Sequence, residues 1–231
     1  MRERPSLLTK PAVRRTTLAV DVVVLSPTAE ALTVLLVRAS AGARERWMLP
    51  WDAPQATEGL EDAAGRIARS VLGTAPAYFE QVGALADGRR HPGEAEVSVG
   101  IVALSPSGAG TPREDAEWFP IASLPALAPR HRTVVERAAA VVRQRVDQSP
   151  LAFRLLPPTF TLSDLQSIYE LLLSRRLHKA SFRRALQASY LVEPTDEWRS
   201  EGRGRPAQLV RFAPKKRRGA RRGVRFDLFS E

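Results

Sequence analysis

The feature that most constrains this fold is a segment whose apolar residues fall on one face of a helix, flanked by segments rich in β-branched residues. Apolar residues recur at helical spacing over 60–72, which predicts an amphipathic helix with one buried face. Gly59 suits the start of this helix, and Gly73 suits the left-handed conformation that ends it. Runs rich in β-branched residues predict strands before and after the helix, at 18–25, 32–37, 79–85, 97–104 and 117–119. The pattern predicts a domain that mixes strands and helices, opening with a hairpin whose turn begins at Pro27.

Two proline-rich stretches, 120–129 and 150–158, divide the chain further. Between them, the apolar positions over 133–146 predict a second helix with a stripe of valines. We take the second stretch as a domain boundary. The predicted parts are a disordered basic arm, a first domain with a C-terminal linker helix, a second domain, and a basic tail, at 1–16, 17–148, 150–214 and 215–231 respectively.

The second domain has the order of a winged helix-turn-helix. Thr161 followed three residues later by Asp164 predicts a capped helix start. A break at 174–177 separates this helix from another at 178–189. Strands at 191–192 and 209–212 then pair around a loop that contains Gly and Arg. The second helix of such a unit enters the major groove of DNA.

The charge distribution favours a polyanionic partner for the second domain. The chain carries 35 Lys and Arg against 25 Asp and Glu, for a net charge of +10. Almost all of the excess lies after residue 150, where there are 17 basic and eight acidic side chains.

The absence of cysteine excludes a disulfide scaffold, a thiolate zinc site and a cysteine nucleophile. No apolar run is long enough to span a membrane, so we expect a cytoplasmic protein.

A motif in the first domain resembles the Nudix box. Leu49-Pro50 precedes the 60–72 helix, and Glu58, Arg66 and Gly73 stand at the spacing of that motif's first glutamate, arginine and last glycine. Three glutamate positions of the motif are occupied instead by Ile67, Ser70 and Val71. None of these residues is an anionic ligand for Mg²⁺, which a Nudix hydrolase needs against the diphosphate. The resemblance therefore implies a Nudix-like domain without a metal site, without a cofactor and without hydrolysis.

The glycine pair that follows Leu-Pro in the motif is also replaced, by Trp51-Asp52. Trp51 and Trp47 are open to two roles, as core residues or as rings that stack on a ligand. Arg66 is equally open to an ion pair with Asp62 one turn away. His91 stands beside a proline on a loop, and we expect it to be solvated. The residues that we nominate for contact with a small anionic ligand are Arg38, Trp51, Glu58, Arg66, Asp87, Arg89 and Arg90.

The second domain supplies residue types that suit DNA. Arginine bonds guanine, glutamine bonds adenine, and an alanine methyl contacts thymine, so the helix face opposite Phe182 and Leu186 suits base edges. Polar residues at the start of the first helix and arginines in the wing suit phosphates. The nominated DNA contacts are Thr161, Ser163, Gln166, Lys179, Ala180, Ser181, Arg183, Arg184, Gln187, Arg203 and Arg205. A run of seven basic residues in 215–225 adds attraction to phosphates without sequence information.

Together the two domains resemble the Nudix-related transcriptional regulators. The likeness is closest in Thr161-Leu-x-x-Leu165, Phe182-Arg-Arg184 and Arg205-Pro-Ala-Gln-Leu209. It implies an α/β (α+β) Nudix-like sandwich with a mixed sheet, followed by a mainly α winged helix-turn-helix domain. It also implies a homodimeric bacterial repressor that binds a double-stranded DNA operator in the nucleoid and responds to ADP-ribose or a sugar-related effector. A Nudix hydrolase and an RNA-binding or architectural protein remain as alternatives.

Overall fold

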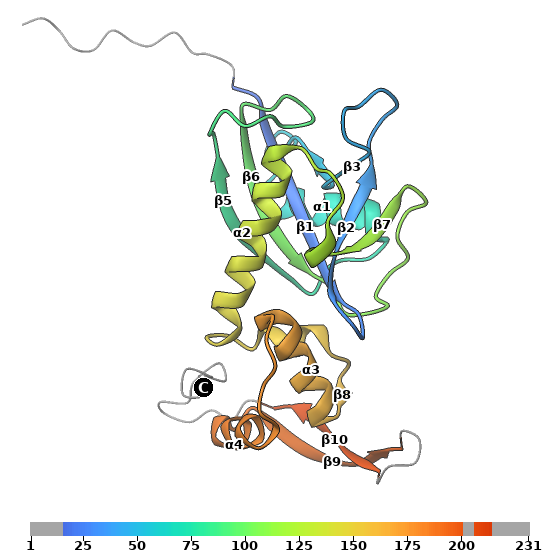
Figure 1. Cartoon of the computed structure of the whole chain (residues 1–231), viewed down its shortest axis with the longest axis vertical. Coiled ribbons are helices and arrows are strands. Elements are labelled where there is room, and N and C mark those ends of the chain that lie inside the picture. Colours follow the sequence, from blue (N-terminus) through green and yellow to red (C-terminus); the bar gives the residue numbers. More distant parts are fainter. Residues whose placement is uncertain (1–15, 201–205, 214–231) are drawn as a thin grey trace, which may run out of the picture.

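The structure is a computed structural model that describes residues 16–200 and 206–213. Figure 1 shows an upper lobe, in which helices cover a sheet, and a lower lobe of helices beside a small sheet. The upper lobe contains β1 (Leu18–Pro27), β2 (Leu32–Arg38), β3 (Trp47–Met48), β4 (Trp51–Asp52), α1 (Leu60–Leu72), β5 (Tyr78–Leu85), β6 (Val97–Leu104), β7 (Ala116–Pro120), η1 (Ile121–Ser123) and α2 (Pro129–Val146). The lower lobe contains η2 (Leu151–Leu155), β8 (Thr159–Phe160), α3 (Leu162–Leu173), α4 (Lys179–Ser189), β9 (Val192–Arg199) and β10 (Ala207–Phe212).

The large sheet is mixed, which confirms the predicted fold class. Its strands follow the order β3-β2-β1-β6-β5, with β4 paired to β1 and β7 paired to β2. Strands β1 and β6 run parallel, and the other pairs are antiparallel. The predicted hairpin is confirmed, since β1 pairs with β2 through Leu25 opposite Val34. The small sheet has the order β8-β10-β9.

Strand β1 is buried on both faces because helices cover both sides of the sheet. Val20, Val22 and Val24 pack with the apolar face of α1. Val23 and Leu25 lie in the other core, together with the valines of α2. Side chains alternate along a strand, so Asp21 shares the α2 side with Val23 and Leu25.

Helix α1 has the predicted bounds, and Gly73 ends it in the left-handed conformation at φ 74°. Helix α2 begins at Pro129, four residues before the predicted start. Proline favours the first helical position because it has no N–H to leave unpaired there. The first turn of α2 buries Arg130, His131 and Thr133. Because these buried side chains are polar, the apolar pattern in the sequence begins only after this turn.

The winged-helix elements follow the predicted order. The capping box at the start of α3 is confirmed, because the Asp164 amide donates to Thr161 Oγ1 at 3.1 Å and the Thr161 amide donates to Asp164 Oδ2 at 2.8 Å. Helix α3 ends at Leu173 with Ser174 as its C-cap, and α4 matches its predicted range to within one residue. Strands β9 and β10 are longer than predicted, and the short strands β3, β4 and β8 were not predicted.

One hydrophobic core runs through both lobes. Val142 and Val146 of α2 belong to the same cluster as Phe153 of η2 and Leu165 of α3. The proline-rich stretch at 150–158 is therefore anchored by buried side chains of η2 rather than solvated throughout. Among the described residues, no helix combines the length and apolar character that crossing a bilayer requires.

Candidate functional site

Arg66 of α1 fastens the loop that precedes its own helix. Its guanidinium donates to both carboxylate oxygens of Glu58 at 2.9 Å, to Asp52 Oδ2 at 2.6 Å and to the carbonyl of Ala53 at 3.1 Å. Glu58 also accepts from the Gln55 amide at 2.9 Å. The alternative ion pair of Arg66 with Asp62 is wrong, because Asp52, brought in by β4, takes that place. Glu58 and Arg66 thus fix the conformation of the loop before α1, and most of the N–H donors of Arg66 are used in these hydrogen bonds.

The hydrogen bonds from Arg66 to Glu58, Asp52 and Ala53, which we call the clamp, change the pKa of Glu58. The hydrogen bond from Arg66, followed by the bond from the Gln55 amide, lowers the Glu58 pKa from 4.5 to about 2. Because the folded pKa is the lower one, the contribution of the carboxylate to stability is complete above pH 4.5 and is lost as the pH falls through about 2. We expect carboxyl NMR titration to give this midpoint and Arg66→Gln to return it toward 4.5. An unchanged midpoint in Arg66→Gln would contradict the clamp.

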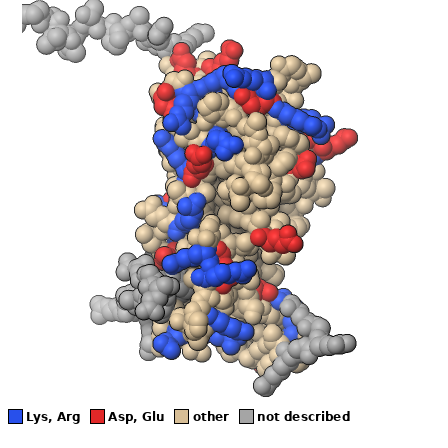
Figure 2. Space-filling model, in the orientation of Figure 1, with Lys and Arg blue, Asp and Glu red and all other residues tan. Residues whose placement is uncertain are grey.

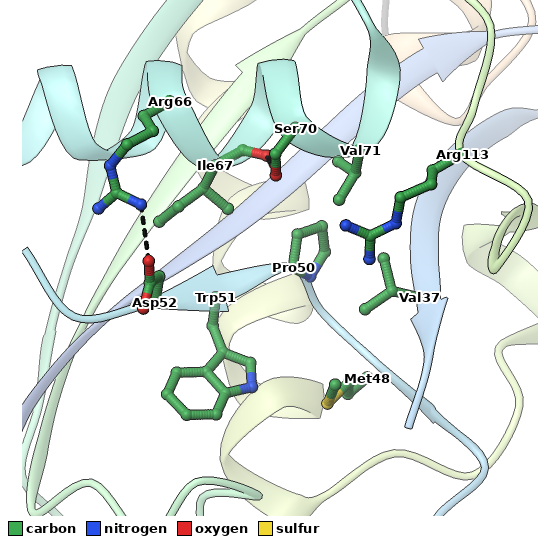
Figure 3. Close-up of a pocket in the computed structure, with 10 residues that line it drawn as sticks. All are labelled: Val37, Met48, Pro50, Trp51, Asp52, Arg66, Ile67, Ser70, Val71 and Arg113. Atoms are coloured by element: carbon green, nitrogen blue, oxygen red, sulfur yellow. Dashed lines mark hydrogen bonds and ion pairs between the residues drawn. The ribbon is translucent and has the colours of Figure 1, made fainter. Parts of the chain in front are cut away.

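A cavity of about 150 Å³ lies beside this clamp, between α1 and the β3–β4 segment. The Nudix-box positions Ile67, Ser70 and Val71 line it from α1 (Figure 3). Arg113, whose amide donates to the Val71 carbonyl at 2.8 Å, lines it at the C-terminal end of α1 and pairs with Asp115. At the positions where the motif places metal-binding glutamates, this cavity is thus walled by aliphatic carbon and one hydroxyl, which cannot hold Mg²⁺.

A second cavity, of about 190 Å³, is also lined by Trp51 and Met48. Trp47, Trp51 and Met48 provide apolar walls, and Arg44 and Arg90 provide positive charge. Arg90 forms an ion pair with Glu45. Trp47 is a core residue, since it is 8% exposed, and it also lines the cavity, whereas contact of either tryptophan with a ligand stays a prediction. Aromatic walls beside guanidinium groups suit a flat anionic ligand.

Of the other nominated ligand residues, Arg90 lines the second cavity, whereas Arg38, Asp87 and Arg89 line neither. Arg90, Arg89 and Asp87 lie on the loop between β5 and β6, and only Arg90 of the three lines either cavity. Arg89 pairs with Asp87 at 3.3 Å and donates to Thr133 of α2. The Arg38 guanidinium lies 5.5 Å from the centre of the Trp47 ring, where it supports the cavity wall from outside.

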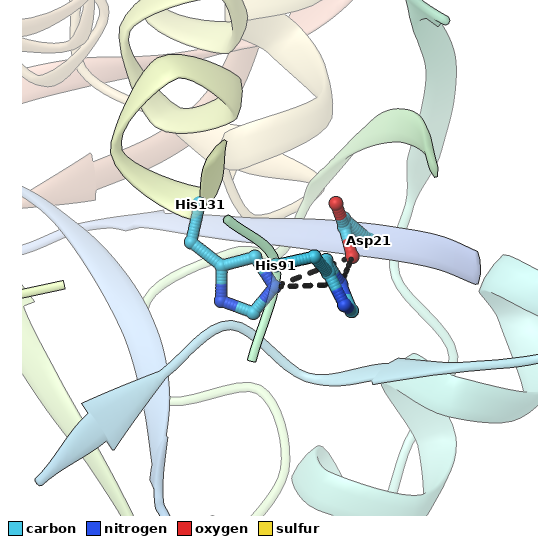
Figure 4. Close-up of side chains that lie close together, drawn as sticks. All are labelled: Asp21, His91 and His131. Carbon is cyan, nitrogen blue, oxygen red and sulfur yellow. Dashed lines mark hydrogen bonds and ion pairs between the residues drawn. The ribbon is translucent and has the colours of Figure 1, made fainter. Parts of the chain in front are cut away.

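Asp21, His91 and His131 form a buried cluster (Figure 4), and the chain neighbours of His91, Arg90 and Pro92, line the second cavity. His91 Nε2 lies 2.9 Å from Asp21 Oδ1, and His131 Nε2 lies 3.3 Å from the same oxygen. The two Nε2 atoms are 3.1 Å apart. The expectation that His91 is solvated is wrong, because the loop folds inward and leaves the side chain 2% exposed.

Backbone donors decide the protonation of both histidines. The Gly93 amide donates to His91 Nδ1 at 3.0 Å, and the Leu49 amide donates to His131 Nδ1 at 3.1 Å. An Nδ1 that accepts a hydrogen bond carries no proton, so each Nε2 carries one and donates toward Asp21. A histidine that binds a metal through Nε2 needs the opposite arrangement, with Nδ1 donating. The cluster groups possible metal ligands, but its hydrogen bonds make it a carboxylate held by two N–H donors.

Burial lowers the pKa of His131, against the opposing effect of its hydrogen bond to Asp21. The pKa of Asp21 also lies well below its usual range, because hydrogen bonds from His131 and His91 outweigh the burial that raises it. The sequence signal for this cluster is Asp21 itself, a carboxylate inside a strand that is otherwise apolar on both faces. Such a group requires hydrogen-bond donors from elsewhere in the fold, but the sequence does not identify them.

The lowered pKa of His131 gives the second pH prediction. The pKa of His131 in the folded protein lies below its ordinary value of 6.5, so folding favours the neutral imidazole. The resulting contribution to the free energy of unfolding is complete above pH 6.5 and is lost as the pH falls through the folded pKa. We expect unfolding free energy to fall below pH 6.5, with a slope approaching about 1.4 kcal/mol per pH unit for this one proton. Urea unfolding of the wild type and of His131→Gln between pH 7 and 5 measures the difference. Equal slopes in the two proteins would show that His131 does not titrate this way.

Helix α4 presents a polar face to solvent on the lower lobe. Phe182 and Leu186 are buried against α3, as predicted. The nominated residues on the opposite face, Lys179, Ala180, Arg183, Arg184 and Gln187, are exposed, and Ser181 is half-buried. Among the described residues, no carboxylate forms an ion pair with Arg183 or Arg184. Figure 2 shows several basic side chains gathered on this lobe.

The other nominated DNA contacts divide into two groups. Ser163 is exposed in the first turn of α3. Thr161 is buried in the capping box, and Gln166 donates to Glu170 at 3.0 Å and to the Leu177 carbonyl at 2.9 Å. These two side chains hold the helix start and the turn before α4. Arg203 and Arg205 lie outside the described residues, as do most of the N-terminal arm and the whole basic tail.

Comparison with known proteins agrees with this architecture. The NUDIX domain model matches residues 15–138, and the model of the NrtR DNA-binding winged helix domain matches residues 152–212. The ADPR responsive transcriptional repressor NtrR of Acinetobacter baylyi is 33% identical over 206 residues, which cover 85% of this chain and 82% of that protein.

Solved structures give the same result. Shewanella oneidensis NrtR in complex with a 27mer DNA superposes with a TM-score of 0.74 at 30% identity, covering 85% of this chain and 94% of that one. The same protein without DNA gives a TM-score of 0.75 over 86% of this chain and 95% of that one, also at 30% identity. A MutT/nudix family protein of Enterococcus faecalis shares the fold, with a TM-score of 0.71 at 20% identity, over 87% and 89% of the two chains. The chain therefore belongs to the NrtR family, in which a NUDIX domain precedes a DNA-binding winged helix domain.

Proposed function

We propose that this protein is a transcriptional repressor that binds operator DNA through α4 and responds to ADP-ribose or a related compound in its NUDIX domain. The exposed basic face of α4 carries the proposal. Arg199 in this lobe has a carboxylate partner in Asp164 at 2.7 Å, whereas no described carboxylate pairs with Arg183 or Arg184. Donors in that position on the second helix of a winged helix-turn-helix suit guanine in the major groove.

The NUDIX domain of this repressor binds its effector without hydrolysing it. The α1 positions that line the first cavity are Ile67, Ser70 and Val71, and Glu58 is engaged by Arg66. Glu61 and Asp62 are exposed on the first turn of α1 and do not line the cavity. Without a carboxylate cluster there, Mg²⁺ cannot neutralise the charge of phosphoryl transfer.

The effector contacts the second cavity in this proposal. Its tryptophan walls suit a nucleobase or a sugar ring, and Arg44 and Arg90 suit phosphate oxygens. Response to ADP-ribose is named for the Acinetobacter relative, and it supplies the first effector to test.

We propose that the repressor is a homodimer on a two-fold symmetric operator and acts in the nucleoid. The valine stripe of α2 does not support this, because Val134, Val135, Val142 and Val146 are buried within the chain's own core. Light scattering of the free protein and of its operator complex measures the state directly.

Selection from random DNA duplexes, with and without ADP-ribose, tests the function as a whole. We expect an enriched palindrome whose binding changes by about 5- to 150-fold on addition of ADP-ribose, the usual range of allosteric coupling. In parallel, incubation with Mg²⁺ and ADP-ribose should release no phosphorylated product. Enrichment of no sequence, or equal binding of single strands, would favour an RNA-binding or architectural protein. Product release would favour a hydrolase.

Truncation after Pro214 removes the basic run of 215–225. We expect all duplexes to bind more weakly by a similar factor, because phosphate contacts carry no base information. The slope of log K against log salt should flatten by about 0.9 for each phosphate that the tail no longer neutralises. Titrations of operator and random duplexes at several salt concentrations check both effects. Loss of operator binding alone would contradict this role of the tail.

A further inference from the structure

We propose that the buried cluster of Asp21, His91 and His131 makes the β5–β6 loop and helix α2 one unit, so that an effector in the second cavity changes the position of the winged helix through α2. The inference rests on the proposed function and adds the means of its regulation. His131 and Thr133 are positioning residues here, since neither lines either of the two cavities and both act through the loop.

The first step joins the cavity to the loop. Trp51 lines both cavities, and its ring meets His91 edge to face with ring centres 4.8 Å apart. The indole also rests on Gly93, where a methyl group would overlap it. Arg90, which lines the same cavity, is the residue before His91. An effector that moves either Trp51 or Arg90 therefore acts directly on this loop.

The second step joins the loop to the first turn of α2 at several points, one of which is the buried Arg130 guanidinium that donates to the Ala95 carbonyl at 2.6 Å. His91 Nε2 and His131 Nε2 both donate to Asp21 Oδ1, so the carboxylate links the loop to α2 (Figure 4). The amide of Arg130 donates to the Arg90 carbonyl at 3.3 Å. Arg89 donates to Thr133 Oγ1. Because these contacts lie on one turn of the helix, the loop cannot shift without moving α2 or breaking buried hydrogen bonds.

The third step joins α2 to the DNA-binding lobe. The last turns of α2 pack against η2 and α3, and Val142 and Val146 share a core with Phe153 and Leu165. Helix α4 packs on α3 through Phe182, which contacts the Tyr169 ring. A rigid helix that is fixed at one end to the loop and at the other to α3 carries a displacement between them.

The experiment measures the coupling rather than either affinity alone. Operator duplex is titrated by fluorescence anisotropy with and without saturating ADP-ribose, and ADP-ribose is titrated by calorimetry with and without the duplex. The variants are His131→Gln, which keeps a donor toward Asp21 but loses the acceptor for Leu49, and Thr133→Val, which removes the acceptor of Arg89. Arg132→Gln is the matched control, because this neighbouring α2 side chain is exposed and, among the described residues, its one hydrogen bond goes to the Pro125 carbonyl.

We expect both variants to bind operator as the wild type does in the absence of ADP-ribose, within about threefold, and their coupling to fall from the wild-type factor to within about twofold of none. Arg132→Gln should retain the wild-type coupling. Thr133→Val keeps the test valid if His131→Gln fails to fold, since threonine and valine have the same shape. Coupling preserved in the folded variants would overturn this inference and leave the proposed function intact. A wild type that binds operator without responding to ADP-ribose would overturn both.

Discussion

Arg184→Ala is expected to weaken operator binding by about 5- to 150-fold, which corresponds to removal of one bidentate arginine–guanine pair at about 1–3 kcal/mol. Arg184 is exposed on the outer face of α4, and no described carboxylate pairs with it. Because such a pair identifies one base, the variant should also tolerate substitution of that base pair. Titration of the wild type and the variant on operators with single base changes measures both the weaker binding and the relaxed preference.

Arg176→Ala provides a matched control for this experiment. Arg176 lies just before α4 and is also exposed, but it pairs with Glu170 at 3.0 Å. We expect its removal to weaken specific and random duplexes alike, if it changes either. Should Arg184→Ala behave in that way, with equal weakening of every duplex, α4 would be a phosphate-binding helix and its assigned role in base recognition would be wrong.

Asp21→Ala is expected to lower the free energy of unfolding by about 2–6 kcal/mol, because it leaves two buried N–H donors without an acceptor and each such donor costs about 1–3 kcal/mol. Asp21 is fully buried, and its carboxylate accepts hydrogen bonds from two buried histidines. Alanine leaves both Nε2–H groups without an acceptor and opens a cavity between β1 and α2. Equilibrium unfolding in urea, with circular dichroism and fluorescence as independent probes, measures the change.

Asp21→Asn and Asp196→Ala complete this test. Asparagine keeps one acceptor oxygen in nearly the same volume, so it should cost less than alanine. Asp196 is exposed on β9, and its removal should change stability by no more than about 0.5 kcal/mol. Near-wild-type stability of Asp21→Ala would mean that the histidines find other acceptors, and the cluster would then not hold α2.

Local patterns along the chain were enough to define most elements of this protein. The period of the apolar residues and the glycines at 59 and 73 defined α1 to the residue, because a helix with one buried face and a left-handed end depends on neighbours along the chain. The same holds for the capping box of α3 and the buried face of α4. The replacement of the Nudix glutamates was equally evident, since it depends only on which residues occupy fixed positions of the motif.

Which distant groups meet became clear only from the packing of these elements. Arg66 takes Asp52 rather than Asp62 because β4 carries Asp52 to the helix, across 14 positions of sequence. His91 is buried because the β5–β6 loop folds onto α2, and His131 reaches Asp21 only after α2 has packed on β1. Hydrogen bonds between such groups depend on three-dimensional proximity, which residue type and spacing do not encode directly. Local periodicity therefore defined the elements, and long-range packing defined the buried network that joins the cavity to the helix leading to the DNA-binding lobe.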